Sequence, residues 1–345
     1  MRSSAASDVY KRQWISISLV VQFAGLFYIN NYFLSSQTEI KAKKVLKSEP
    51  KKKDVVVKIP QNAKNVSVSF DGRYVAYYQD NILKVVDSKT GDGKNVEFED
   101  GTEISFYKWL KDRNRMLIAE KRNSDEGYKF NLSYYEADKD IKENSKELDC
   151  YDEKAQINDI QESHYTNVIY VKIQNRGRRT NIYRINIMNE MQKVYTNSYM
   201  IGNIGILYLD DKLIYEDDIY HNIYVTGREE PITIKGVKNP VWIGADENDR
   251  IYIGDEQNGK ISNIYCGSIN SDEDAYENIN LNKSVNRDDI FLMPSGKIYI
   301  NDNLKGVVTD VATGKQYIYK GNFIQIFEGG VASISNGQLE EVSLN

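Results

Sequence analysis

The sequence predicts an all-β protein: a β-propeller of four-stranded blades, closed by an N-terminal strand and preceded by one transmembrane helix. Three observations predict this arrangement. A polar turn that leads into an apolar, often Tyr-containing strand recurs seven times at a mean spacing of about 43 residues, the length of one four-stranded blade. An isolated apolar run precedes the first repeat, and an uncharged apolar stretch lies near the N-terminus. Seven blades are expected, with six as the alternative.

The apolar stretch spans residues 14–34 and reads WISISLVVQFAGLFYINNYFL. Its 21 residues would form about 30 Å of helix, enough to cross the hydrocarbon core of a bilayer. Trp14 at one end and Tyr28 and Tyr32 near the other resemble the aromatic belts of membrane helices. We therefore predict a transmembrane signal anchor. A signal peptide cleaved near Leu34 is the alternative, and a buried soluble helix is the third interpretation.

The segments around this span are not expected to fold. Residues 1–13 read MRSSAASDVYKRQ, which resembles translated sequencing-adapter sequence, so we exclude them from the fold argument. Residues 35–53 are polar and lysine-rich, as in a solvated linker. These lysines would draw their side of the span toward the cytoplasm, but the cations of the true N-terminus are unknown if residues 1–13 are foreign. We predict a single-pass cell-membrane protein whose propeller, residues 54–345, is extracytoplasmic.

Within residues 54–345 short strand patterns alternate with turn residues, and helical periodicity is nearly absent. In residues 181–187 the side chains of Tyr183, Ile185 and Ile187 alternate with polar ones, as a half-buried strand requires. Near the start of the domain, three apolar segments bounded by Asp-Gly and Asp-Asn pairs predict hairpins: residues 66–70, 74–78 and 82–87.

The repeat is defined by its turns. The widest interval between turns contains the charged residues 136–154, which we interpret as an insertion in a surface loop. The other intervals stay near the length of one blade. One turn residue marks each of the seven copies: Gly72, Asn114, Thr166, Asp211, Asp249, Gly296 and Gly330.

The last copy contains only three predicted strands, over residues 323–327, 331–335 and 339–344. Residues 55–59, with the sequence VVVKI, are an apolar run without a partner in the first copy. We predict that they supply the missing fourth strand of the last blade. Such pairing joins the two ends of the ring and removes unpaired sheet edges.

A family resemblance follows from the repeat. The segment SFDGRYVAYY (residues 69–78) and, less closely, KWLKDRNRMLIAE (residues 108–120) resemble the repeat of TolB-type propellers and of the N-terminal propeller of dipeptidyl peptidase IV. The layout of span, lysine-rich linker and Tyr-rich propeller also resembles uncharacterised membrane-anchored proteins of clostridial type. The resemblance implies a propeller fold. It implies no chemistry, because the repeated Asp and Gly serve turns.

No motif in the sequence predicts catalysis. The G-x-S-x-G elbow of the hydrolase domain that follows such propellers is absent, as are phosphate-binding loops and H-E-x-x-H. Only His164 and His221 supply imidazoles. We therefore predict a protein that is not an enzyme, with no catalytic, cofactor-binding or metal-binding residues. The acidic groups of residues 216–221 and 246–249 are explained as hairpin turns, with a cation site as the alternative.

Charge narrows the choice of partners. Residues 60–345 carry 34 Lys or Arg against 46 Asp or Glu, so nucleic acid is not expected to bind. The densest basic group is Arg176, Arg178 and Arg179, which are possible contacts for a polyanion and otherwise only a solvated turn.

The function predicted from these observations is binding without catalysis. A propeller face or the central channel would bind a protein, peptide or cell-wall polymer. The first alternative is an enzyme or degenerate enzyme at the channel, which requires acidic and Tyr side chains from several blades to meet in one pocket. The second is a structural assembly subunit, which requires an exposed apolar patch on the blade edges.

Overall fold

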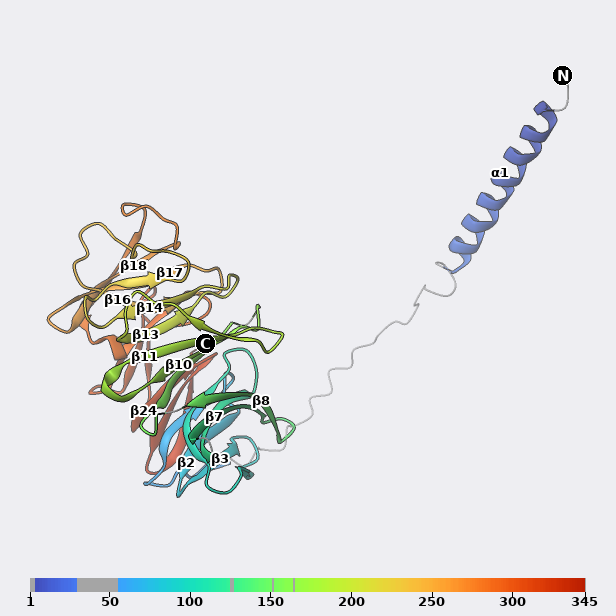
Figure 1. Cartoon of the computed structure of the whole chain (residues 1–345). Helices are drawn as coiled ribbons and strands as arrows, with labels where there is room; N and C mark the ends of the chain where they lie inside the picture. Colours follow the sequence, from blue (N-terminus) through green and yellow to red (C-terminus); the bar gives the residue numbers. More distant parts are fainter. Residues whose placement is uncertain (1–3, 30–54, 125–126, 151, 164, 345) are drawn as a thin grey trace. The chain divides into compact units, whose positions relative to one another are not determined.

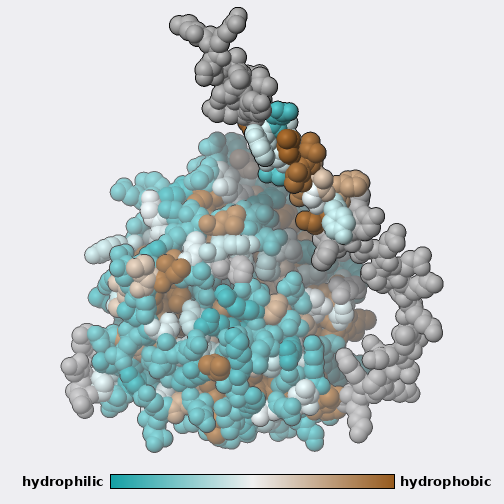
Figure 2. All heavy atoms as spheres, turned by 90° about the vertical axis from the view of Figure 1, so that its right-hand side faces the viewer, coloured by the Kyte–Doolittle hydropathy of each residue, from teal (hydrophilic) through white to brown (hydrophobic). Residues whose placement is uncertain are grey.

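The computed structural model describes residues 4–29, 55–124, 127–150, 152–163 and 165–344, and the chain divides into two compact units, Met1–Lys53 and Asp54–Asn345. The first unit contains one helix, α1 (Ser4–Tyr28), with no acidic residue in its first turn. Apolar side chains along α1 are exposed, among them Trp14, Phe23 and Phe27, and Figure 2 shows hydrophobic residues along the helix.

Part of the predicted span lies outside the described residues. Residues 30–34, at the end of that span, and the predicted linker 35–53 are among the residues that the structure does not describe. Among the residues that it does describe, no helix combines the length and the apolar character needed to span a membrane. The helix is therefore present, and the transmembrane span stays a prediction.

The second unit is an all-β propeller of seven blades, each an antiparallel sheet (Figure 1). Blade 1 contains β1 (Lys64–Val68), β2 (Tyr74–Gln79), β3 (Ile82–Asp87) and β4 (Gly93–Val96). Blade 2 contains β5 (Glu103–Trp109), β6 (Arg115–Ser124), β7 (Gly127–Glu136) and β8 (Ile141–Cys150). Blade 3 contains β9 (Gln156–Glu162), β10 (Ile169–Gln174), β11 (Thr180–Ile185) and β12 (Met191–Val194). Blade 4 contains β13 (Ile201–Ile206), β14 (Leu213–Asp217) and β15 (Ile223–Val225).

The remaining blades follow the same order. Blade 5 contains β16 (Pro240–Ala245), β17 (Ile251–Gln257), β18 (Lys260–Gly267) and β19 (Glu277–Val285). Blade 6 contains β20 (Ile290–Leu292), β21 (Ile298–Asp302), β22 (Val307–Asp310) and β23 (Gln316–Ile318). Blade 7 contains β24 (Asn322–Phe327), β25 (Gly330–Ser335) and β26 (Gln338–Ser343). The predicted all-β propeller and its seven blades are thus confirmed, with three strands in the sheets of blades 4 and 7 among the described residues.

The first strand of each blade lies nearest the centre of the ring. Contacts between first strands of neighbouring blades run from β24 through β1, β5, β9, β13 and β16 to β20. Six of the seven predicted turn residues fall between the first and second strands of their blades, and the seventh, Gly330, is the first residue of β25. Because each blade repeats the same up-and-down order, these turns gather at one end of the ring.

Two sequence-based assignments inside the blades are wrong. Residues 136–154 are not a loop insertion, since most of them form β8, the outer strand of blade 2. An outer strand faces water, so charged residues are tolerated there and the apolar alternation that marks a strand is weak. The strand predicted over 181–187 ends at Ile185, because a turn from Asn186 leaves Ile187 exposed.

The core is divided among the joints between blades. Buried residues form seven clusters, and each contains side chains from two adjacent blades. In the joint of blades 1 and 2, for example, Leu83 of β3 packs in one cluster with Met116 and Ile118 of β6. No blade has a complete core of its own, so a blade is stabilised by its neighbours on both sides.

The ring is closed by residues 55–59, which we call the closing segment. The Ile59 amide donates to the Gly337 carbonyl at 2.8 Å, and the Leu339 amide donates to the Val57 carbonyl at 2.9 Å. Lys58 lies opposite Gln338 of β26 in the resulting antiparallel bridge. Val57 and Ile59 are buried in the cluster that joins blades 7 and 1. The predicted closure by residues 55–59 is confirmed, although they pair with β26 through one isolated bridge and do not form a full fourth strand.

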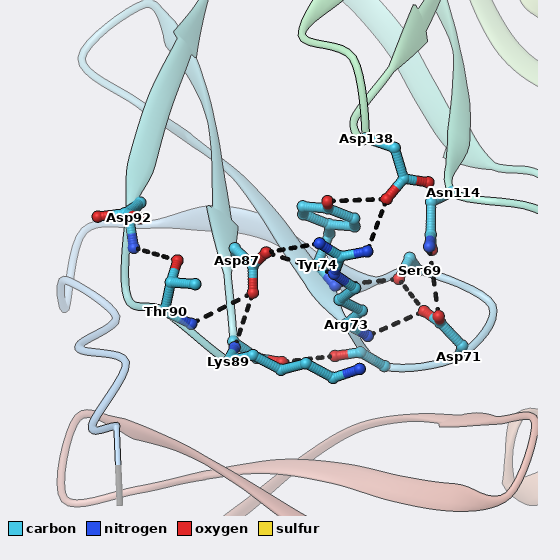
Figure 3. A network of polar contacts seen from close by, with 12 residues as sticks. Ser69, Asp71, Arg73, Tyr74, Asp87, Lys89, Thr90, Asp92, Asn114 and Asp138 are labelled. Atoms are coloured by element: carbon cyan, nitrogen blue, oxygen red, sulfur yellow. Dashed lines mark hydrogen bonds and ion pairs between the residues drawn. The ribbon is translucent and has the colours of Figure 1, made fainter. Parts of the chain in front are cut away.

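Polar side chains of the repeated turn also join neighbouring blades (Figure 3). Asp71 accepts hydrogen bonds from the Ser69 hydroxyl and the Arg73 amide inside its own turn, at 2.9 and 3.0 Å. It also accepts one from the Asn114 side chain of blade 2, at 3.2 Å. The Tyr74 hydroxyl of blade 1 donates to an Asp138 carboxylate oxygen of blade 2, at 3.0 Å. The motif therefore shapes a turn and ties two blades.

The same arrangement recurs between blades 3 and 4. Asp211, the turn residue of blade 4, accepts a hydrogen bond from the Tyr170 hydroxyl at 2.7 Å and from Arg184 Nε at 2.9 Å. Partial burial raises the pKa of Asp211, but the bonds from Arg184 and Tyr170 outweigh burial and leave that pKa below its ordinary value.

We expect Asp211→Asn to lower the free energy of unfolding by about 1–3 kcal/mol at pH 7, because hydrogen bonds to a carboxylate become bonds to a neutral amide. A carboxyl whose pKa is lower in the folded state contributes stability above its unfolded pKa and loses that contribution as the pH falls through the folded pKa. The difference between wild type and variant should therefore shrink below about pH 4, as measured by urea unfolding at several pH values.

The matched control is Asp210→Asn, the same change at the adjacent exposed residue. It should alter the free energy of unfolding by less than about 0.5 kcal/mol. Equal losses in the two variants would contradict the role of Asp211, as would a difference that stays constant with pH.

Candidate functional site

The turns between first and second strands surround a cavity at one end of the ring, which we call the mouth. It has a volume of about 480 Å³. Turns of six blades, from blade 2 to blade 7, contribute to its wall, and Leu344, which follows β26, completes it. The lining residues are Lys111, Asp112, Tyr165, Tyr208, Glu247, Met293, Pro294, Ser295, Lys297, Tyr299, Glu328, Gly329 and Leu344.

The mouth combines aromatic and acidic side chains. Tyr165 is 60% exposed, whereas Tyr208 is half-buried. Burial raises the pKa of Tyr208, so its hydroxyl stays protonated at neutral pH. Glu247 of blade 5 and Glu328 of blade 7 both line the mouth. The sequence alone does not show which tyrosines lie at the rim of the propeller and which lie in its core. The structure shows that Tyr165, Tyr208 and Tyr299 line this cavity.

A second cavity, of about 320 Å³, lies along the first strands of blades 2 to 6, and we call it the channel. Its wall carries Lys108 and Asp159, whose ammonium and carboxylate groups are 3.5 Å apart. Gln161 donates to both oxygens of Asp159 at 3.0 Å. Burial lowers the pKa of Lys108 and the Asp159 carboxylate opposes that shift. The channel is therefore a polar space with a paired cation in its wall.

A buried ion pair closes another part of the channel wall. Arg287 Nη1 lies 2.9 Å from a Glu216 carboxylate oxygen, and Arg287 also donates to the Trp242 carbonyl. Glu216 accepts further hydrogen bonds from the Trp242 amide at 2.5 Å and the Asn203 side chain at 2.7 Å. The Glu216 carboxylate is thus fully occupied by protein donors. A buried charge with this many partners serves to hold three blades in register.

The acidic turn clusters have structural roles. Asp249 accepts hydrogen bonds from the backbone amides of Tyr208 and Leu209, at 2.6 and 2.9 Å, and so joins blades 4 and 5. Asp217 accepts one from the Ser198 hydroxyl at 2.7 Å. Within the described ranges no group of three or more His, Cys, Asp or Glu side chains is arranged to hold a metal ion. Hairpin turns and joints between blades account for these residues.

The predicted basic group lies away from the mouth. Arg176, Arg178 and Arg179 are exposed in the hairpin between β10 and β11, which is at the opposite end of the blade from the mouth. The Arg176 amide donates to an Asp152 carboxylate oxygen at 2.9 Å, and the Arg179 guanidinium lies 5.6 Å from the centre of the Tyr199 ring. Their contact with a polyanion stays a prediction.

The channel residues Lys108, Asp159 and Arg287 were not predicted from the sequence. A charged side chain inside an otherwise apolar strand, as in the segment around Lys108, was the available signal. Whether such a side chain lines the channel depends on which strand of the blade faces the centre of the ring. It also depends on the register between first and second strands, which is irregular in six of the seven blades. Such bulges redirect side chains and are not visible in the pattern of residues.

Comparisons with known proteins indicate the fold alone. No protein-family profile and no curated protein sequence matches the chain. A structure titled as the mitotic checkpoint complex contains a chain that is 10% identical, with a TM-score of 0.52, over 86% of this chain and 97% of that one. A structure of prolyl endopeptidases contains one that is 12% identical, with a TM-score of 0.53, over 76% of this chain and 42% of that one.

A structure of Porphyromonas gingivalis dipeptidyl peptidase 4 is 11% identical, over 74% of this chain and 44% of that one. Its TM-score of 0.46 is too low to carry an argument. Against both peptidases this chain matches less than half of the other chain. At these identities the likeness to the checkpoint and endopeptidase chains supports the β-propeller fold and transfers no activity.

Proposed function

We propose that this protein is a non-enzymatic binding protein, and that its mouth binds a peptide or an extended segment of another protein. The observation that carries the proposal is the convergence of turns from six blades on one cavity lined by three tyrosines. Tyrosine offers a large flat contact surface with a polar tip, and it is enriched where proteins bind peptides and other proteins. The volume of the mouth lies in the range of ligand pockets.

Catalysis at the same place is the second candidate. Carboxyl groups of Asp112, Glu247 and Glu328 meet the mouth tyrosines, so acidic and Tyr side chains from several blades do share one cavity. The raised pKa of Tyr208, caused by burial, makes this hydroxyl a poor general base. Turnover of a substrate by the full chain, abolished by Glu247→Gln, would favour an enzyme over a binding protein.

Assembly with other subunits through a blade edge is a third candidate function, and fewer observations support it. The outer hairpin of blade 3 exposes the apolar side chains of Ile187 and Met188, each about three-quarters exposed. Figure 2 shows a propeller surface that is otherwise mostly hydrophilic, with scattered hydrophobic residues. Two neighbouring side chains are a small patch by the standard of protein interfaces.

The apolar surface of α1 supports the predicted attachment to a membrane. Its exposed side chains, such as Val20 and Phe23, have no charged neighbour from Trp14 to Tyr28. We propose that this segment anchors the chain in the cell membrane with the propeller outside.

The full chain expressed in a Gram-positive host should stay with the membrane pellet after alkaline washing. Val20→Lys should release it, because a lysine near the centre of a span costs about 2.5–3.5 kcal/mol. Protease added to intact cells should remove the propeller. Recovery of the wild-type chain in the soluble fraction would contradict anchoring, and protection until lysis would contradict the outward orientation.

Binding at the mouth predicts the effect of Tyr165→Ala. A random octapeptide library is passed over the immobilised full chain, and retained peptide is measured by mass spectrometry. Loss of one aromatic contact should reduce retention about fivefold to thirtyfold, the equivalent of 1–2 kcal/mol.

Tyr220→Ala is the matched control, since Tyr220 is 75% exposed in the hairpin between β14 and β15, away from the mouth. It should retain peptides as the wild type does. Equal losses in both variants, or no retention by the wild type, would overturn binding at the mouth.

A further inference from the structure

Lys111 lies where the mouth meets the channel. It follows β5 in the turn of blade 2, and it lines both the mouth and the channel. It also lines a smaller cavity of about 50 Å³ between blades 2, 3 and 4, whose wall includes Trp109 and Leu207.

The Lys111 ammonium group has no carboxylate partner. Its contacts are the Tyr208 hydroxyl at 3.3 Å and the Tyr208 ring, whose centre is 5.4 Å away. In the part of the chain that the structure describes, no ion pair involves Lys111, whereas Lys108 is paired with Asp159 and Arg287 with Glu216. Lys111 is therefore the cation of the channel wall that remains available to a ligand.

Its surroundings favour an anion at this position. The protein around Lys111 lowers the pKa of its ammonium group, and the negative charge of Asp159 opposes that shift without forming a pair. The Lys111 side chain is nevertheless exposed to solvent, so its ammonium group can be reached by an anion from solution. An anionic ligand group beside Lys111 would restore the missing partner and form a charge-assisted hydrogen bond.

The arrangement selects the kind of anion. A phosphate is bound best by several donors or by a guanidinium fork, and the Arg287 guanidinium is already occupied by Glu216 and the Trp242 carbonyl. A lysine ammonium group matches a single carboxylate, and Lys111, unlike Lys297 of the mouth, also lines the channel. The carboxylates of Glu247 and Glu328 in the mouth disfavour a ligand with several negative charges. One carboxylate at the end of an otherwise neutral or basic chain satisfies both conditions.

We propose that Lys111 binds the C-terminal carboxylate of a peptide whose last residues occupy the mouth. This inference rests on the proposed function and specifies its ligand. The tyrosines contact the body of the peptide, and Lys111 recognises its free end.

The test compares two random octapeptide libraries of the same composition, one with free C-terminal carboxylates and one with C-terminal amides, on the immobilised full chain. Wild type should retain the free acids about tenfold to a hundredfold better than the amides, the effect of a hydrogen bond to a charged group. Lys111→Met should remove this preference, so that the variant retains acids and amides alike. Lys111→Arg, which keeps the charge, should preserve a preference for acids.

Lys260→Met is the control, because Lys260 is exposed at the start of β18, next to the hairpin that joins β17 and β18 away from the mouth. It should behave as wild type. Equal retention of acids and amides by the wild type would overturn the role of Lys111 while peptide binding stands, and it would point to side-chain contacts instead. Retention of neither library would overturn peptide binding at the mouth itself. A preference that survives in Lys111→Met would assign the carboxylate to another group.

Discussion

Two backbone hydrogen bonds join the first residues of the propeller to its last strand, across almost the whole length of the domain. Each blade is stabilised through joints with both neighbours, so a ring with one open joint would expose two apolar blade faces. The closing segment fills that joint with Val57 and Ile59, which pack against Phe327 of blade 7 and Val75 of blade 1. The mouth, the channel and their charges all depend on this closure, because they are assembled from separate blades.

The polar turn residues show how a fold motif also builds a site. Asp71, Asp211 and Asp249 each bond to a neighbouring blade, and this fixes the spacing of successive turns around the axis. Turns held in this way present Tyr208, Glu247 and their neighbours to one cavity. The resulting cavity combines tyrosines and carboxylates with the ammonium groups of Lys111 and Lys297, a distribution of charge that suits the free end of a chain better than a polyanion.

Much of the fold was predictable because turns and periods are local. The seven turn residues and the apolar closing segment could be recognised in the sequence, and each lies where the repeat placed it. Strand β8 was not predicted from the sequence, because an outer strand that is exposed to solvent needs few apolar residues. The pairing of Glu216 with Arg287 was not predictable, since 71 residues separate them and only ring geometry brings them together. Lys111 looked like one more charged turn residue for the same reason.

Closure of the ring is tested most directly by a disulfide between Lys58→Cys and Gln338→Cys. These residues form a non-hydrogen-bonded antiparallel pair, in which Cα atoms are about 4.5 Å apart and a disulfide can form. Mild oxidation should link the two cysteines, as detected by peptide mapping, and should raise the midpoint of urea unfolding reversibly on reduction. Val56→Cys with Gln338→Cys, displaced by two residues, should link poorly. No link in the first pair, or equal linking in both, would contradict closure by residues 55–59.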